Sequence, residues 1–290
     1  MNETYGIPQN WLDTPDTSVL LPAERSLPVR ARDSHKGDYG KVLILGGSVG
    51  YTGAVSVCTS AAVRSGAGLV SVGVPGDIYP ILAVKQDVAM PFPADGFRDI
   101  TEKLGWCDVC VIGPGMGRDR KRLELVRDVL EAVQVPTVAD ADALFALSRD
   151  MELLRRVNAP LVLTPHAVEF TRMGGVLTEN RVADARRFAD RYGCTLVLKG
   201  HRTVVAFADG PAYVLAAGNP GMAKGGSGDV LAGILGGLLG QLPLREAVLT
   251  GVCVHAAAGD LCAKELGEYG MTPLDMIGAI PAVTKLMTGR

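Results

Sequence analysis

The sequence predicts an α/β protein of three layers, α/β/α, in which helices cover both faces of a mostly parallel sheet. From about residue 41 onward, short runs rich in β-branched residues alternate with longer helical patterns. This alternation is typical of crossover units, which place parallel strands between two layers of helices. The chain has 290 residues, 48% of them hydrophobic, which is enough for one large core.

Each element of this prediction rests on its own run of residues. Aliphatic and β-branched residues predict strands over 41–45, 69–74, 109–113, 137–139, 161–164 and 195–199. Helical spacing predicts helices over 52–65, 118–132, 141–148 and 181–192, and the region from residue 228 onward is expected to be all-helical. Asp209-Gly210, between 204–208 and 212–215, is a hairpin signal that predicts an antiparallel edge.

The first 34 residues differ from the rest, because they contain four prolines and no sustained period. We therefore expect an N-terminal arm over 1–34 and a single domain over 35–290. The arm is polar and lacks the charged-then-apolar pattern of a signal peptide. No run of 18 to 20 uninterrupted apolar residues occurs, and the nearest, 230–242, is interpreted as a buried helix. These features predict a cytoplasmic protein without a membrane partner.

Composition narrows the class of ligand. Lys plus Arg is 29 and Asp plus Glu is 31, so the formal net charge is −2 and no basic excess points to nucleic acid. The 36 glycines, without a collagen period, indicate turns where the backbone approaches a small ligand closely. Cys107 and Cys110 have the CxxC spacing of redox or zinc sites, but no second such pair accompanies them, so we interpret them as structural.

Ligands of open parallel sheets bind beyond the carboxyl ends of the strands, so the loops there are the candidate site. Residues 46–54 and 113–117 are two glycine-rich loops, each between a predicted strand and a helix. Each favours either an anionic or polar ligand at a helix N-terminus or a sharp turn that requires glycine. In a third loop, Pro165 is expected at the first helical position. His166 and Glu169, three residues apart, either hold a substrate or a metal's water or stabilise that helix.

The fourth loop, 218–229, carries the strongest signal. Gly225, Gly226, Ser227 and Gly228 place free backbone N–H groups where they can converge on a phosphate, and Asp229 follows in the first helical turn. A carboxylate repels a bound phosphate, so its presence favours a base that removes a proton from an attacking hydroxyl. The alternative is an aspartate that only complements the helix dipole. No Walker A pattern occurs.

Taken in order, these segments resemble the ADP/ATP-dependent (S)-NAD(P)H-hydrate dehydratases of the ribokinase-like superfamily. The resemblance is carried by 35–54, GPGMG at 113–117, DADAL at 140–144, LTPHAVEF at 163–170, 197–205 and GNPGMAKGGSGDVLAGIL at 218–235. It implies a hydro-lyase that phosphorylates the ring hydroxyl of hydrated NADH or NADPH and then eliminates phosphate. It also implies Mg²⁺, ADP or ATP as phosphoryl donor, a homo-oligomer such as a homotetramer, and a separate epimerase as functional partner.

The resemblance also implies roles for individual residues. Asp229 is the expected catalytic base, and Ala54, Gly117, His166 and Asp229 are the expected substrate contacts. Glu169 is expected to place a metal indirectly. The expected nucleotide-binding residues are Lys199, Gly200, His201, Arg202, Thr203, Gly225, Gly226, Ser227 and Gly228. Ala167-Val168 and His201 depart from the family's usual residues, Pro-Gly and a small residue.

Two alternatives stay open at this point. A ribokinase-like kinase of a small hydroxylated metabolite would share the fold, the glycine-rich loop and the aspartate base. A nucleotide-sensing module without catalysis would not require Asp229 at all. The first alternative differs in its product, which would be a phosphorylated alcohol instead of restored NADH. The second alternative differs because it would turn over no substrate.

Overall fold

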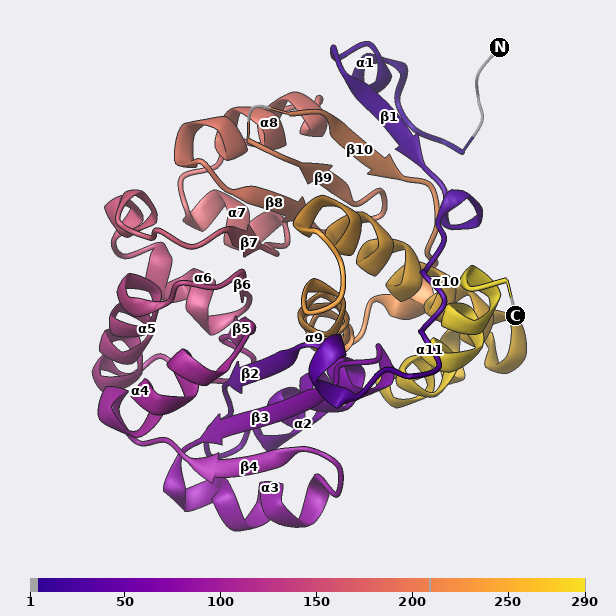
Figure 1. Ribbon diagram of the computed structural model, residues 1–290. Coiled ribbons are helices and arrows are strands. Elements are labelled where there is room, and N and C mark those ends of the chain that lie inside the picture. The colour runs from indigo at the N-terminus through magenta and orange to yellow at the C-terminus, as the bar shows by residue number, and fades with distance from the viewer. Residues whose placement is uncertain (1–4, 209, 290) are drawn as a thin grey trace.

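The computed structural model describes residues 5–208 and 210–289 of the chain (Figure 1). Within them, ten strands form one sheet in the order β1-β10-β9-β8-β7-β6-β5-β2-β3-β4. Their bounds are β1 (Thr17–Leu20), β2 (Lys41–Leu45), β3 (Leu69–Val74), β4 (Met90–Pro93), β5 (Val109–Ile112), β6 (Thr137–Ala139), β7 (Leu161–Leu163), β8 (Thr195–Leu198), β9 (Val204–Ala206) and β10 (Ala212–Leu215).

The helices follow the strands in alternation over the first two thirds of the chain. The α-helices are α1 (Gln9–Leu12), α2 (Thr52–Arg64), α3 (Tyr79–Lys85), α4 (Phe97–Trp106), α5 (Arg120–Ala132), α6 (Asp142–Leu147), α7 (Ala167–Arg172), α8 (Arg181–Tyr192), α9 (Ser227–Leu239), α10 (Leu244–Gly270) and α11 (Pro273–Met287). Short 3₁₀ turns are η1 (Pro22–Glu24), η2 (Lys36–Tyr39), η3 (Gly76–Ile78), η4 (Met151–Arg155) and η5 (Pro220–Met222).

The predicted fold class is confirmed. Neighbouring strands from β4 through β8 run parallel, and only β9 is antiparallel to its neighbours β8 and β10. Alternate residues of each strand enter opposite cores, because successive side chains of a strand point to opposite faces. Val42 and Ile44 belong to the core that includes α2, α9, α10 and α11, whereas Leu43 and Leu45 belong to the core that includes α4, α5, α6 and α8.

The antiparallel pair β9–β10 is present, but it is not the edge of the sheet. Strand β1, from the segment predicted as an arm, pairs in parallel with β10 and forms that edge. The predicted turn residue Asp209 lies outside the described residues. Part of the arm is therefore built into the sheet, and the division into 1–34 and 35–290 stays a prediction.

By length and composition alone, one helix among the described residues, α10, could cross a membrane. Two thirds of its most apolar window is buried within the protein, where α10 packs against α9 and α11. The shorter helix α9, over the stretch interpreted as buried, contributes eleven buried residues to the core. Both helices have the composition expected of core helices that support the loops before them.

Candidate active site

The four predicted loops meet at one edge of the sheet, because they follow strands that run parallel to one another. The loops after β2 and β5 contact each other directly: the Gly47 N–H donates to the carbonyl of Pro114 over 2.8 Å, and the Ser48 hydroxyl donates to the carbonyl of Gly115 over 2.8 Å. An added Cβ on Gly115 would lie 2.9 Å from the Cβ of Ala54. The structure therefore joins the two loops that carry Ala54 and Gly117.

Asp142 ties this pair of loops to the end of β6. Its carboxylate accepts the Gly117 N–H over 2.9 Å and the Nε–H of Arg118 over 2.7 Å. Asp142 begins α6, and the residue before it, Ala141, has a φ of 50°. A non-glycine residue in this conformation is strained, and such strain is found where surrounding contacts hold a functional loop.

The helix after β7 begins differently from the expectation. Pro165 is not the first helical residue, since His166 is the N-cap of α7 and Ala167 begins the helix. The His166 Nδ1 accepts the N–H groups of Val168 and Glu169 over 3.1 and 3.4 Å, and the His166 N–H donates to Glu169 Oε2 over 2.9 Å. His166 and Glu169 thus form a reciprocal cap, because each side chain satisfies a backbone donor of the other.

Lys199, directly after β8, enters the centre of the site. Its Nζ lies 2.9 Å from Asp140 Oδ1, which also accepts the Thr164 hydroxyl over 2.7 Å. Burial alone would lower the pKa of Lys199, but the charges of Asp140, Glu169 and Asp229 outweigh it, so the pKa is raised. A Cβ on Gly228 would lie 3.1 Å from this Nζ. The ammonium is therefore retained and sits against the backbone of the glycine-rich loop.

Asp229 lies at the third position of α9, in the first turn as predicted. Burial is the main cause that raises the pKa of its carboxyl to about 7; the charge of Asp140 raises it further, and that of Lys199 opposes the shift. The charge of Asp142 also acts on it. The charges that act on Asp229 therefore include Asp142, which holds Gly117, and Lys199, which lies against Gly228. A carboxyl with this pKa can take up a proton near neutral pH.

A cavity of about 650 Å³ opens beside Lys199 and Gly228. Of the predicted nucleotide-binding residues, it is lined by Lys199, Gly200, His201, Thr203, Ser227 and Gly228, and His166 also lines it. Gly225, Gly226 and Arg202 do not line it in the described part of the chain. The guanidinium of Arg202 instead donates to the backbone carbonyl of Tyr5, so this side chain is engaged in a contact with the N-terminal arm.

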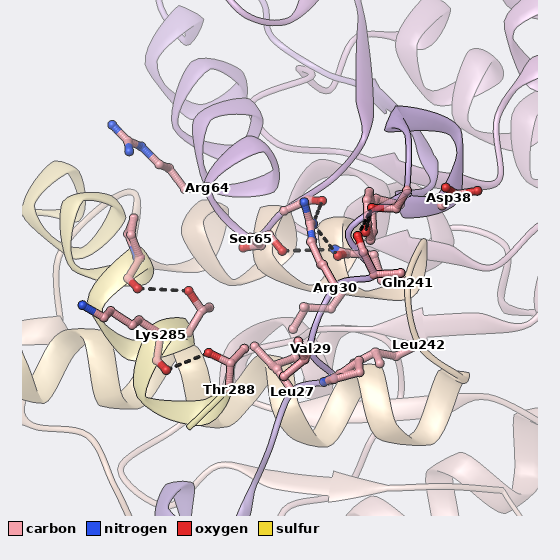
Figure 2. Close-up of a pocket in the computed structure, with 18 of the residues that line it drawn as sticks. Leu27, Val29, Arg30, Asp38, Arg64, Ser65, Gln241, Leu242, Lys285 and Thr288 are labelled. Atoms are coloured by element: carbon pink, nitrogen blue, oxygen red, sulfur yellow. Dashed lines mark hydrogen bonds between the residues drawn. The ribbon is translucent and has the colours of Figure 1, made fainter. Parts of the chain in front are cut away.

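A second and larger cavity, of about 760 Å³, lies at the opposite ends of α2 and α9, beside the segment 27–39 (Figure 2). The Arg30 side chain, which lines this cavity, is already engaged in contacts within the protein. The Arg30 guanidinium stacks 3.7 Å from the ring centre of Tyr39, donates to the Gln241 side chain over 2.8 Å and donates to the Gly66 carbonyl. We therefore place the chemistry in the cavity beside Asp229.

The two cysteines of the CxxC pair are structural, as interpreted. Cys107 directly follows α4 and Cys110 lies in β5, and both side chains are buried in the same core. Burial raises the pKa of Cys107 to about 11 and that of Cys110 well above its usual value. Neither thiol ionises near neutral pH, and among the described residues no group of three or more metal-ligating side chains was found.

Sequence reasoning missed four polar residues that the structure brings to the site, and one of them, Asp142, holds the Gly117 N–H from the start of α6. Asp140 holds Lys199, and its position directly after β6 is the signal that would have found it. His255 and Asp260 lie on α10 and contact the loop before α9. The sequence points to His255 and Asp260 less clearly, because they are far in sequence from any glycine-rich loop that precedes a helix.

The comparisons with known proteins identify the family of the chain. The family model described as NAD(P)H-hydrate dehydratase matches residues 42–282. A bifunctional NAD(P)H-hydrate repair enzyme of Moorella thermoacetica is 42% identical over 97% of this chain and 56% of its own length. An ADP-dependent (S)-NAD(P)H-hydrate dehydratase of Staphylococcus aureus is 34% identical over 90% of this chain and 94% of its own length. The chain spans about half the length of the bifunctional relatives it matches.

Solved structures confirm the ribokinase-like fold. A ribokinase-like superfamily protein of Enterococcus faecalis has a TM-score of 0.86 at 31% identity, covering 95% of this chain and 98% of that one. The ADP/ATP-dependent NAD(P)H-hydrate dehydratase of Bacillus subtilis, co-crystallised with ATP/Mg²⁺, has a TM-score of 0.79 at 31% identity, covering 90% and 95%. By fold, by sequence and by the match over residues 42–282, the chain belongs to the NAD(P)H-hydrate dehydratase family.

Proposed function

We propose that this protein is an ADP-dependent (S)-NAD(P)H-hydrate dehydratase, which restores NADH and NADPH from their hydrates. The observation that carries the proposal is Asp229, whose carboxyl has a pKa of about 7 in the first turn of α9. It directly follows Gly228, which lines the cavity together with Lys199, and the charge of Asp142, which holds the Gly117 N–H, acts on it. This arrangement supports the transfer of a phosphoryl group from a nucleotide in the cavity to a substrate hydroxyl held at the loops of Ala54 and Gly117.

In the first step, the Asp229 carboxylate takes the proton of the ring hydroxyl, and the hydroxyl oxygen bonds to the terminal phosphorus of ADP. The bond from that phosphorus to AMP breaks, so AMP leaves. In the second step, the carbon–oxygen bond to the new phosphate breaks and the ring loses a proton, which restores the reduced dinucleotide. The free N–H groups at the start of α9 and the ammonium of Lys199 would stabilise the charge on the transferring group.

Mg²⁺ would enter this site with the nucleotide. The carboxylates present do not make a cage, because Asp142 binds Gly117 and Arg118, and one oxygen of Asp140 binds Lys199. Glu169 Oε1 lies 3.5 Å from His166 Nε2, so it fits a metal held through water. When bound, Mg²⁺ supplies charge neutralisation on the phosphates. The homo-oligomer, the separate epimerase and the cytoplasmic location stay predictions.

The test mixes purified protein with hydrated NADH, Mg²⁺ and either ADP or ATP, and follows the return of NADH absorbance and the release of AMP or ADP. We expect recovery that requires a nucleotide, with ADP the better donor. Asp229→Asn should lower the rate by about 10² to 10⁴-fold. No recovery, in protein shown to bind ADP, would exclude the dehydratase, and a stable phosphorylated alcohol as product would identify a kinase instead.

Asp275→Asn is a matched control for that variant. Asp275 occupies the third position of α11, as Asp229 does in α9, but it is part of a reciprocal cap with Thr272. If Asp229 only complemented the helix dipole, the two variants would have similar small effects on turnover. We expect Asp275→Asn to keep the wild-type rate, because its carboxylate accepts the N–H and hydroxyl of Thr272 and does not line the cavity.

A further inference from the structure

The loop that leads into α9 is fastened to α10 at both of its ends. At the first end, the Asp260 carboxylate accepts the Gly218 N–H over 3.0 Å and the side-chain amide of Asn219 over 2.9 Å. At the second end, the His255 Nε2 lies 2.9 Å from the carbonyl oxygen of Ser227 and 3.3 Å from its hydroxyl. Gly218, Asn219, Ser227 and His255 all line the candidate nucleotide cavity.

The contact with Ser227 determines which nitrogen of the His255 imidazole carries a hydrogen. A carbonyl oxygen only accepts, so the His255 Nε2 must carry a hydrogen and donate it to Ser227. Burial lowers the pKa of His255 to about 4, and the hydrogen bond to Ser227 opposes that shift only in part. The ring is therefore neutral at working pH and acts as a fixed donor, not as a proton acceptor for the reaction.

The middle of the loop also rests on α10. The Lys224 ammonium donates to the carbonyl oxygens of Glu268 and Tyr269, at 3.4 and 2.7 Å, near the end of that helix. A Cβ on Gly259 would lie 2.5 Å from the sulfur of Met222, so the Met222 side chain packs closely on this glycine. His255 and Gly259, four residues apart, lie on the same side of the helix, and the contacts of Asp260 with Gly218 and Asn219 show that it also reaches the loop.

We propose that His255 and Asp260 are positioning residues, which hold the loop 218–229 so that the N–H groups at the start of α9 and Asp229 face the transferring phosphoryl group. This inference rests on the proposed function. Neither residue need touch a reacting atom. A shift of about 1 Å in the positions of reacting groups can lower a rate by about 100-fold, so rigid support of this loop is expected to matter for turnover.

The test compares His255→Leu, His255→Gln and Thr250→Val in the full chain. Gln places an amide N–H close to the position of Nε2 and should restore the donor, whereas Leu keeps the volume without a donor. Thr250 is a control on the same helix, since it is buried and its hydroxyl has no hydrogen-bond partner in the described structure. We expect kcat to fall about 10- to 100-fold in His255→Leu, to recover within about threefold of wild type in His255→Gln, and to stay unchanged in Thr250→Val.

The kcat–pH profile and the KM for ADP separate a positioning role of these residues from a general loss of structure. In His255→Leu, the acidic limb of the kcat–pH profile should move to lower pH, because a loosened first turn exposes Asp229 to water. Asp260→Asn should raise the KM for ADP more than it lowers kcat, since Gly218 and Asn219 line the nucleotide cavity. Unchanged kcat and an unchanged pH profile in folded His255→Leu would overturn the inference.

The two proposals fail in different ways. If wild-type protein itself restores no NADH, the proposed function fails and the inference fails with it. If wild-type protein is active and His255→Leu matches it, only the inference fails. If His255→Gln is as slow as His255→Leu although both melt at the wild-type temperature, the hydrogen bond to Ser227 is not the cause, and the inference is again overturned.

Discussion

The ammonium of Lys199 lies 2.9 Å from the carboxylate of Asp140, although 59 residues separate them in sequence. This pair joins the end of β8 to the end of β6 and holds the cation against Gly228. Asp140 and Asp229 compete for the same ammonium, because the charges of both act on it. Burial is the main cause that raises the pKa of Asp229 to about 7, and the charge of Asp140 adds to this rise although Lys199 opposes it.

The rate of turnover should fall at acidic pH because Asp229 must be ionised to accept a proton. Below a pH of about 7, the pKa of this carboxyl, kcat should decrease about tenfold for each pH unit. The kcat–pH profile with saturating nucleotide measures this. A profile that stays flat down to pH 5 would show that Asp229 is not the group that limits turnover.

Asp229→Asn should make the protein more stable at neutral and alkaline pH. The folded state raises the pKa of this carboxyl from 3.8 to about 7, so the folded state binds the proton more tightly than the unfolded chain does. Stability from this group is therefore lost as pH rises from about 4 to about 7. We expect a gain on the order of 2 kcal/mol in the free energy of unfolding at pH 8, with little difference at pH 4. Urea denaturation of the wild type and the variant at pH 8 and pH 4 measures the difference in free energy of unfolding at each pH.

Lys199→Met should lower the free energy of unfolding by about 3 kcal/mol, because it leaves the buried carboxylate of Asp140 without its cation. The double variant Lys199→Met/Asp140→Asn removes both charges and should recover at least half of that loss. Turnover should stay low in both variants, since the ammonium beside Gly228 is absent. Urea denaturation of the two single variants and the double variant gives the coupling energy; additive effects would show that the pair does not interact.

Gly228→Ala and Gly225→Ala should differ although they lie in the same loop. A Cβ at 228 would meet the Lys199 Nζ at 3.1 Å, whereas a Cβ at 225 has no atom within 4 Å. We expect Gly228→Ala to lower kcat about tenfold by displacing the ammonium, and Gly225→Ala to keep it within about twofold. Equal rates in the two variants would contradict the position given to Lys199.

His201→Ala should weaken nucleotide binding more than Arg202→Ala. His201 lines the cavity, whereas the Arg202 guanidinium is bound to the Tyr5 carbonyl in the arm. Calorimetric titration with ADP and Mg²⁺ should show a several-fold higher Kd for His201→Ala, and for Arg202→Ala a small change only. The reverse order would restore Arg202 to the nucleotide site predicted from the family resemblance.

The sequence by itself determined most of the central sheet and the loops around it. The strands at 41–45 and 69–74 and the helix at 181–192 were predicted with the bounds that the structure has. Such elements follow from local periodicity, because a run of side chains of period 2 or 3.6 must bury one face or one stripe. The position of Asp229 in the first helical turn was likewise predictable from nearby residues, since it depends only on the glycines before it and the helix after it.

Only the tertiary structure decided which polar groups support Asp229 and the loop before it. Asp140, His255 and Asp260 reach the site from a different strand end and a different helix, so no short-range spacing records their contacts. The same holds for β1, which forms the edge of the sheet by pairing with β10 about 195 residues later. The pKa of Asp229 depends on burial and on charges brought together by folding, and the sequence encodes neither directly.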